Sequence, residues 1–344
     1  MAIGRLIVSV YVDNIAQPIS GANVNIVGEN TNINVVTDES GKTNEIELAA
    51  PDIEYSLEPQ DVIRPFSEYT VTVTKEGLEP SVVSGVQIFS DIVSYQDVFL
   101  IPPNENNGEN LTVISAPALW ANDPAKNIEN PNNVNIMAKV LPRVIIPEYI
   151  IVHDGVPSNT SAANYYVSFP DYIKNVASSE IYPSWPRETL KANVHAIVSF
   201  TLNRIFTEWY PSKGYNFTIT STTTYDQKYT HNRTIFDTIS NVVDEIFTEY
   251  LTFPDRPYPF LAQYSDGIKV VREGWLSQWG SKSLGDQGYN AMQIVRYYYG
   301  NNIELATAEL VSDFPTSFPG YNLKEGACGE EVQLLQNELN KIRG

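Results

Sequence analysis

The N-terminal part of the chain alternates between apolar and polar positions, as strands with one buried face do. From Leu6 to Val12 every second residue is a leucine or valine, and a period of two places such side chains on one face of a strand. We expect further strands at residues 22–27, 69–74 and 95–101. Several short strands between glycine- and proline-containing turns predict a small all-β sandwich over residues 1–102.

The spacing of apolar residues lengthens after residue 140. A buried-strand run, Val144–Val152, comes first. Apolar residues then recur every three or four positions, which is typical of helices packed on a core. We expect helices at residues 171–180, from an N-cap at Ser184 to about residue 206, at about 235–251 and at 290–299. This mixture predicts an α+β unit over residues 141–310.

Two stretches without such periodicity separate these units. Residues 103–140 are rich in Asn and Pro, which is typical of a linker, and a long polar linker is also a place where a protease can cut. Residues 311–320 form a second, short linker. The remaining residues, 321–344, carry glycines followed by Val332, Leu335 and Leu339 at helical spacing. This pattern resembles the start of a peptidoglycan-binding type 1 module, which is incomplete here.

Charge and composition narrow the classes of partner. The chain has 22 basic against 41 acidic residues and a net charge of −19, which argues against binding to nucleic acid or to an anionic membrane surface. The sequence contains no run of about 18 apolar residues, so we do not expect a membrane-spanning segment. The N-terminal apolar run lacks a basic region and a cleavage site, so we do not interpret it as a signal peptide.

The inventory of metal ligands is small. Cys328 is the one cysteine, so no disulfide can form within the chain. The three histidines, His153, His195 and His231, are far apart in the sequence. We therefore expect neither a metal nor a cofactor.

The segment Gly274–Tyr289 is rich in glycine, amides and aromatic residues, and so is a poor core sequence. It predicts a loop in which Trp275 and Trp279 offer flat faces, and Ser277 and Gln278 offer neutral donors and acceptors, to a polar ligand such as carbohydrate. A tight-turned loop that only caps a domain is the alternative.

Three segments in order resemble one family. They are Tyr172–Ala196, Thr223–Asp226 with the helix that follows, and Gly274–Tyr289. Together they resemble the stage II sporulation protein D/LytB peptidoglycan lytic domain over residues 141–305. The order of units is similar to that of spore cortex-lytic enzymes of the SleC type, and the N-terminal sandwich resembles carboxypeptidase-regulatory-like and collagen-binding B-type domains, which act as spacers.

The resemblance implies that Glu180 is the catalytic acid. Cleavage of a glycosidic bond needs a proton on the leaving oxygen. A lytic transglycosylase needs no second carboxylate, because the 6-hydroxyl of muramic acid attacks the anomeric carbon and leaves a 1,6-anhydro sugar. One glutamate can then serve as acid and as base.

Further residues are candidates for the substrate cleft. They are Tyr225, Asp226, Gln263, Tyr264, Ser265, Ser277, Gln278 and Trp279. Glu188 lies in the first turn of a helix, where an acid favours the helix dipole; a substrate contact is its alternative role. We interpret His195 as a core histidine and Lys191 as structural. Some relatives hold zinc through His and Cys, but residues 263–275 contain neither, so no zinc is expected.

The sequence therefore predicts a peptidoglycan lytic transglycosylase that acts on glycan strands of the spore cortex during germination. The resemblance implies a precursor form, activated by a protease near residues 103–145, and a location in the spore or the extracytoplasmic wall. Two alternatives remain open: a non-catalytic wall-binding scaffold, and a phage-tail-associated wall hydrolase.

Overall fold

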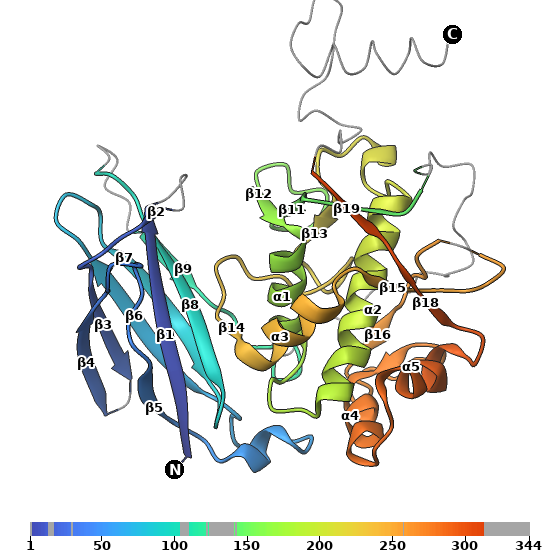
Figure 1. The fold of residues 1–344 in the computed structure, drawn as a ribbon, viewed down its shortest axis with the longest axis horizontal. Coiled ribbons are helices and arrows are strands. Elements are labelled where there is room, and N and C mark those ends of the chain that lie inside the picture. Colours follow the sequence, from blue (N-terminus) through green and yellow to red (C-terminus); the bar gives the residue numbers. More distant parts are fainter. Residues whose placement is uncertain are drawn as a thin grey trace, which may run out of the picture.

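The computed structural model describes residues 2–12, 17–28, 30–103, 110–121, 123, 141, 143–256 and 258–312. Two halves lie side by side, with the β-rich N-terminal half on the left of Figure 1 and a mixed α+β half on the right. The second linker beyond residue 312, the expected peptidoglycan-binding segment 321–344 and Cys328 lie outside the described residues.

Two sheets form the N-terminal half, as the alternating pattern predicts. In the first, β1 (Ala2–Val12) pairs in parallel with β8 (Val93–Leu100) and antiparallel with β5 (Ile46–Ala50) and β2 (Gln17–Pro18). The second has the order β4 (Thr31–Val36), β3 (Asn23–Gly28), β6 (Ser67–Thr74), β7 (Ser81–Ile88) and β9 (Asn110–Val113). A short 3-10 helix, η1 (Ile53–Ser56), follows β5.

The alternating residues meet between the two sheets. Leu6, Val8 and Val10 from β1 are fully buried, as are Val24 and Val71 from the facing sheet. Burial of apolar surface at this interface stabilises the sandwich. Strand β9 lies within the stretch expected to be a linker, and it extends the second sheet by parallel pairing with β7.

Between residues 143 and 312, the described part of the second half contains short strands around five α-helices. The helices are α1 (Phe169–Glu180), α2 (Arg187–Phe206), α3 (Asp237–Ile246), α4 (Gln278–Asp286) and α5 (Ala291–Tyr299), with a 3-10 turn η2 (Pro211–Lys213). The strands are β10 (Ile145–Pro147), β11 (Tyr149–His153), β12 (Asn164–Ser168), β13 (Ile219–Thr220), β14 (Ile235–Phe236), β15 (Glu249–Thr252), β16 (Tyr264–Ser265), β17 (Leu276–Ser277), β18 (Glu304–Thr307) and β19 (Glu309–Val311).

Helix α2 forms the centre of this half. Every residue from Thr189 to Arg204 except Lys191 is buried, and the helix contacts α1, α3, α4 and α5. It begins at Arg187, with Pro186 as its N-cap, rather than after the expected N-cap Ser184. The reason is that a residue preceding proline is disfavoured in helical conformation. The Ser184 hydroxyl instead hydrogen-bonds that of Ser56, at 2.6 Å.

Two further predictions of local structure in this half were wrong. The helix expected at 235–251 is shorter, because Ile235 and Phe236 form strand β14 and residues 249–252 form β15. The segment expected to be a loop contains helix α4, whose N-cap Ser277 accepts a hydrogen bond from the Gly280 amide at 2.9 Å. This capping hydrogen bond favours the start of a helix at this position, although α4 contains two glycines.

The two halves share a core and a sheet. Strand β14 pairs antiparallel with β8, so the second half adds a strand to the first sheet of the sandwich (Figure 1). The Phe89 ring contacts the rings of Tyr182 and Phe236 at 5.6 and 5.1 Å. The Trp185 indole donates to the carbonyl of Ser56 at 2.9 Å. The end of the sandwich therefore belongs to the same packed core as the helices.

Candidate active site

Glu180 is the last residue of α1 and is 4% exposed. Helix α1 ends here because Ile181 is extended. One carboxylate oxygen accepts hydrogen bonds from the Lys228 amide at 2.9 Å and the Tyr264 hydroxyl at 3.3 Å, and the other accepts from the Gln278 side-chain amide at 3.3 Å. Three separate segments thus hold one acidic group, and all three donors are uncharged.

The donors are themselves held in place. Burial, and then the nearby charge of Glu180, raise the pKa of Tyr264 well above its usual value of 10, so this hydroxyl stays protonated and able to donate. The Lys228 ammonium points elsewhere and forms an ion pair with Asp123 at 2.6 Å. Lys228 therefore reaches Glu180 through its backbone and not through its charge.

A small cavity opens at Glu180. Its volume is about 90 Å³, and Glu180, Tyr264, Ser265, Trp275 and Gln278 line it. This volume suits a substituent of a sugar or a few water molecules, and not a length of polymer.

One wall of the acid cavity comes from the stretch that the sequence marks as a linker. Ala118, Ala121 and Asp123 line the cavity. The Ala118 amide donates to the carbonyl of Ser179 at 2.7 Å, immediately beside Glu180. The local sequence does not indicate this wall, because its partners, the Ser179 carbonyl and the Lys228 ammonium, belong to distant segments.

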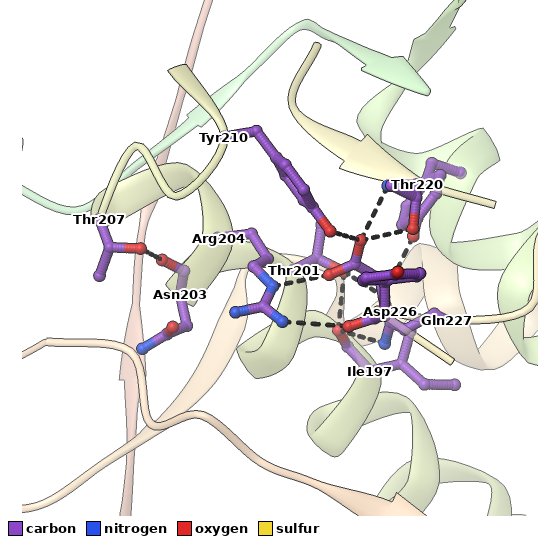
Figure 2. A network of polar contacts seen from close by, with 11 residues as sticks. Ile197, Thr201, Asn203, Arg204, Thr207, Tyr210, Thr220, Asp226 and Gln227 are labelled. Carbon is purple, nitrogen blue, oxygen red and sulfur yellow. Dashed lines mark hydrogen bonds and ion pairs between the residues drawn. The ribbon is translucent and has the colours of Figure 1, made fainter. Parts of the chain in front are cut away.

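Asp226 lies in a different place, a buried network that Figure 2 shows. It is 0% exposed, and Arg204, with 1% of its side chain exposed, donates to it from Nε at 2.7 Å. The second carboxylate oxygen accepts from the Tyr210 hydroxyl at 2.6 Å and from the amide and hydroxyl of Thr220 at 2.9 and 2.7 Å. The Phe200 and Trp209 rings flank the guanidinium, with their centroids 4.7 and 4.6 Å away.

This network anchors the loop that reaches Glu180. It joins α2 to β13 and to the segment that contains Lys228, only two residues after Asp226. The backbone carbonyl of Tyr225 also accepts from Arg204, at 3.2 Å, and the side chain of Tyr225 is half-buried. Asp226 does not line the acid cavity, and its oxygens are already occupied, so it acts on the site through the loop.

The other expected cleft residues divide into two groups. Tyr264, Ser265 and Gln278 join Glu180 at the cavity. Gln263 is buried, and its carbonyl accepts from the Leu276 amide and the Tyr299 hydroxyl at 3.1 and 2.8 Å.

Trp279, Ser277 and Glu188 have structural partners in the fold. The Trp279 ring packs on Trp185 at 5.0 Å, while Ser277 caps α4. Glu188 accepts from the Ala291 amide at 2.8 Å, at the start of α5. The indole at the cavity is that of Trp275 and not that of Trp279.

Two further charged residues have structural partners. His195 is 3% exposed, and its Nε2 lies 2.9 Å from Glu249, whose pKa this hydrogen bond lowers. Lys191 pairs with Glu245 at 2.6 Å. Within the described ranges, no group of three or more His, Cys, Asp or Glu residues is placed to hold a metal, and no described helix is long and apolar enough to cross a membrane.

One segment of the chain matches the model of a known protein family. Residues 158–253 match the family model of the stage II sporulation protein, SpoIID. The match confirms the part of the expected resemblance that covers this segment, which includes Glu180, and the family is linked to peptidoglycan remodelling during sporulation. It gives no support to a closer resemblance to SleC. No curated protein matches the chain.

Solved structures show only weak likeness. The Bacillus anthracis TIE protein is 16% identical with a TM-score of 0.22, and the match covers 30% of this chain and 17% of that one. Klebsiella pneumoniae 5-hydroxyisourate hydrolase is 16% identical with a TM-score of 0.21, over 29% of this chain and 92% of that one. Acinetobacter radioresistens catechol 1,2 dioxygenase is 12% identical with a TM-score of 0.22, over 31% and 55%. Scores this low carry no functional argument.

Proposed function

We propose that this protein cleaves peptidoglycan glycan strands as a lytic transglycosylase, with Glu180 as its acid and base. The observation that carries the proposal is a buried glutamate, inside the segment that matches SpoIID, whose carboxylate faces a cavity and is held by uncharged donors. None of these donors ties the carboxyl group into an ion pair, whereas Asp226 is tied in this way.

The proposed reaction needs one carboxyl group. Protonated Glu180 gives its proton to the glycosidic oxygen as the bond from that oxygen to C1 of muramic acid breaks. The 6-hydroxyl oxygen of the same sugar forms a new bond to C1, and the Glu180 carboxylate takes up the hydroxyl proton. Atoms balance without water, and the enzyme returns to its protonated state. The Tyr264 and Gln278 donors stabilise the carboxylate between these two transfers.

Two other carboxylates near the cavity are already engaged. Asp266 accepts from the backbone amides of Ile268, Lys269 and Val270 at 2.9 to 3.1 Å, and Asp123 pairs with Lys228. A hydrolytic glycosidase uses a second carboxylate as nucleophile or base. Because Asp266 and Asp123 already have hydrogen-bond or ion-pair partners, the site favours the reaction that needs only Glu180.

Mass spectrometry of muropeptides tests the mechanism. Purified peptidoglycan digested by the protein is expected to yield 1,6-anhydro-muramic products, and the Glu180→Gln variant is expected to form them at least about 100-fold more slowly. Glu188→Gln is the matched control, because it removes an acid of the same family segment that accepts from the Ala291 amide at the start of α5 and does not line the acid cavity.

Other outcomes would contradict the proposal. Reducing ends that take up ¹⁸O from labelled water, without anhydro products, would indicate hydrolysis. Full activity in Glu180→Gln would exclude Glu180 as the acid. Tight binding to peptidoglycan with no products would favour a non-catalytic scaffold.

The cortex substrate and the role in germination extend the proposal beyond the chemistry of the site. Their test is digestion of cortex and vegetative peptidoglycan side by side. A precursor activated by loss of the sandwich fits the structure poorly, because this loss would strip β14 of its partner strand and expose Tyr182 and Phe236, whose rings pack on Phe89 of the sandwich. We propose that the sandwich stays attached and supports the lytic half.

A further inference from the structure

A second, larger cavity lies beside the acid cavity. Its volume is about 560 Å³, and it shares Ser265 and Trp275 with the cavity at Glu180. Its other walls include Arg272, Tyr297 and Tyr298. None of the reaction steps proposed above uses this second cavity.

The floor of this second cavity consists of buried and hydrogen-bonded side chains. Trp275 is 7% exposed, and buried Tyr299 donates from its hydroxyl to the carbonyl of Gln263 at 2.8 Å. A Cβ at Gly280 would lie 2.1 Å from the Tyr298 hydroxyl, so glycine is required there for Tyr298 to pack so closely. A cavity with a fixed floor loses little conformational entropy when a ligand binds.

The rim of the second cavity is open and carries groups that recognise sugars. Tyr297 is 67% exposed, and its ring meets that of Tyr298 at 5.0 Å and 75°. Its free face can stack on the apolar face of a sugar ring. Arg272 and Glu273 are exposed beside it and can bond hydroxyl and acetamido groups.

We propose that this cavity binds the part of the glycan strand next to the cleaved bond, with an N-acetylhexosamine stacked on Tyr297. The proposal rests on the proposed function for the identity of the polymer. The acid cavity, at about 90 Å³, is too small to hold a strand, so a polymer cleaved there must extend along the surface. The shared Trp275 and Ser265 make the second cavity the continuation of that path.

Binding of β-1,4-linked N-acetylglucosamine oligomers of two to six sugars tests the proposal. Titration calorimetry with the full chain carrying Glu180→Gln excludes turnover. We expect affinity to rise with oligomer length, and Tyr297→Ala to weaken binding of the longer oligomers by about tenfold, which is the effect of losing ~1.4 kcal/mol of stacking. Tyr166→Ala is the matched control, since Tyr166 is a 71% exposed tyrosine of β12.

Each other outcome has a distinct meaning. Equal binding by the Tyr297 and Tyr166 variants, or no dependence on oligomer length, would overturn the subsite. Binding of a free stem peptide that depends on Tyr297, without binding of the oligomers, would overturn the glycan as its occupant. If oligomers bind through Tyr297 but peptidoglycan is never cleaved, the subsite stands and the proposed function fails. If cleavage depends on Glu180 but Tyr297→Ala does not change oligomer binding, the proposed function stands and the subsite fails.

Discussion

Two buried carboxylates, Glu180 and Asp226, lie in the same family segment and have opposite surroundings. Asp226 accepts from a buried guanidinium, two hydroxyls and an amide, all within 2.9 Å (Figure 2), and it does not line the acid cavity. Glu180 accepts longer bonds of 3.3 Å from Tyr264 and Gln278 beside one of 2.9 Å, and it faces a cavity.

The difference teaches which kind of burial is compatible with catalysis. A carboxylate that is ion-paired and saturated with short donors must remain charged for the fold to be stable. Proton transfer requires a carboxyl group with space in front of it and with donors that tolerate both protonation states. Burial alone does not separate the two cases, because both residues are less than 5% exposed.

Glu180→Gln is expected to have the largest effect, and on activity alone. Loss of the proton donor should lower the cleavage rate by about 10²–10⁴-fold. The free energy of unfolding should change by no more than ~1 kcal/mol, since the amide keeps the shape and most of the contacts. Rates of muropeptide release and denaturant unfolding, measured on the same samples, check both parts. A large loss of stability would place Glu180 in the structural class of Asp226.

Asp226→Ala is expected to have the largest effect on stability. It leaves the Arg204 guanidinium buried without its anion, which costs about 3–5 kcal/mol. The midpoint of urea unfolding measures the loss. The double variant Arg204→Met with Asp226→Leu removes both charges and should lose less than Asp226→Ala alone. If the single and double variants are equally destabilised, the ion pair is not the cause.

Contacts between the two halves give a smaller effect. Arg233 bonds Gln87 of the sandwich and Ser179 of α1, both at 2.7 Å, and burial lowers the pKa of this guanidinium to about 9. Gln87→Leu leaves this cation short of an acceptor and should cost about 1.5–3 kcal/mol.

Thr234→Val is the control for the contact between the halves. It removes a neutral bond to Gln96 of 2.8 Å and should cost about 1 kcal/mol. Thermal unfolding compares the two variants, and the reverse order would contradict the argument from charge.

The matched pair Tyr264→Phe and Tyr210→Phe has the smallest expected effects. Each variant deletes one hydroxyl that donates to one of the two carboxylates. Tyr264→Phe should slow cleavage about fivefold, the equivalent of ~1 kcal/mol, with little change in stability. Tyr210→Phe should cost about 1.5–3 kcal/mol in stability, because its bond to a charged carboxylate is short. Equal effects on activity would remove the distinction between the two sites.

Several features could be predicted from local pattern. The alternation after Leu6 predicted a strand, and the helical spacing from residue 171 and within 187–206 predicted α1 and α2. Each of these elements buries a continuous apolar face, so the spacing of apolar residues within the element itself indicates its type. The placement of Glu180 at the end of a helix follows in the same way.

Other features have no local signal. Asp226 was expected to lie in the cleft, and the structure places it against Arg204, which lies on another element. Trp279 was expected at the cleft, and its ring packs against Trp185 while Trp275 reaches the cavity. Strand β14 forms because β8 of the sandwich offers an unpaired edge, and this depends on residues about 140 positions earlier.

The sequence by itself determined the elements with a continuous apolar face, such as β1, α1 and α2, together with the family segment 158–253 and the glutamate within it that ends α1. The tertiary structure alone decided which acid faces a cavity. Hydrogen-bond donors and ion-pair partners for a buried carboxylate come from distant segments: the Lys228 amide, Tyr264 and Gln278 for Glu180, and Arg204 for Asp226. Electrostatic energy depends on distances in space, and spacing along the chain does not encode them.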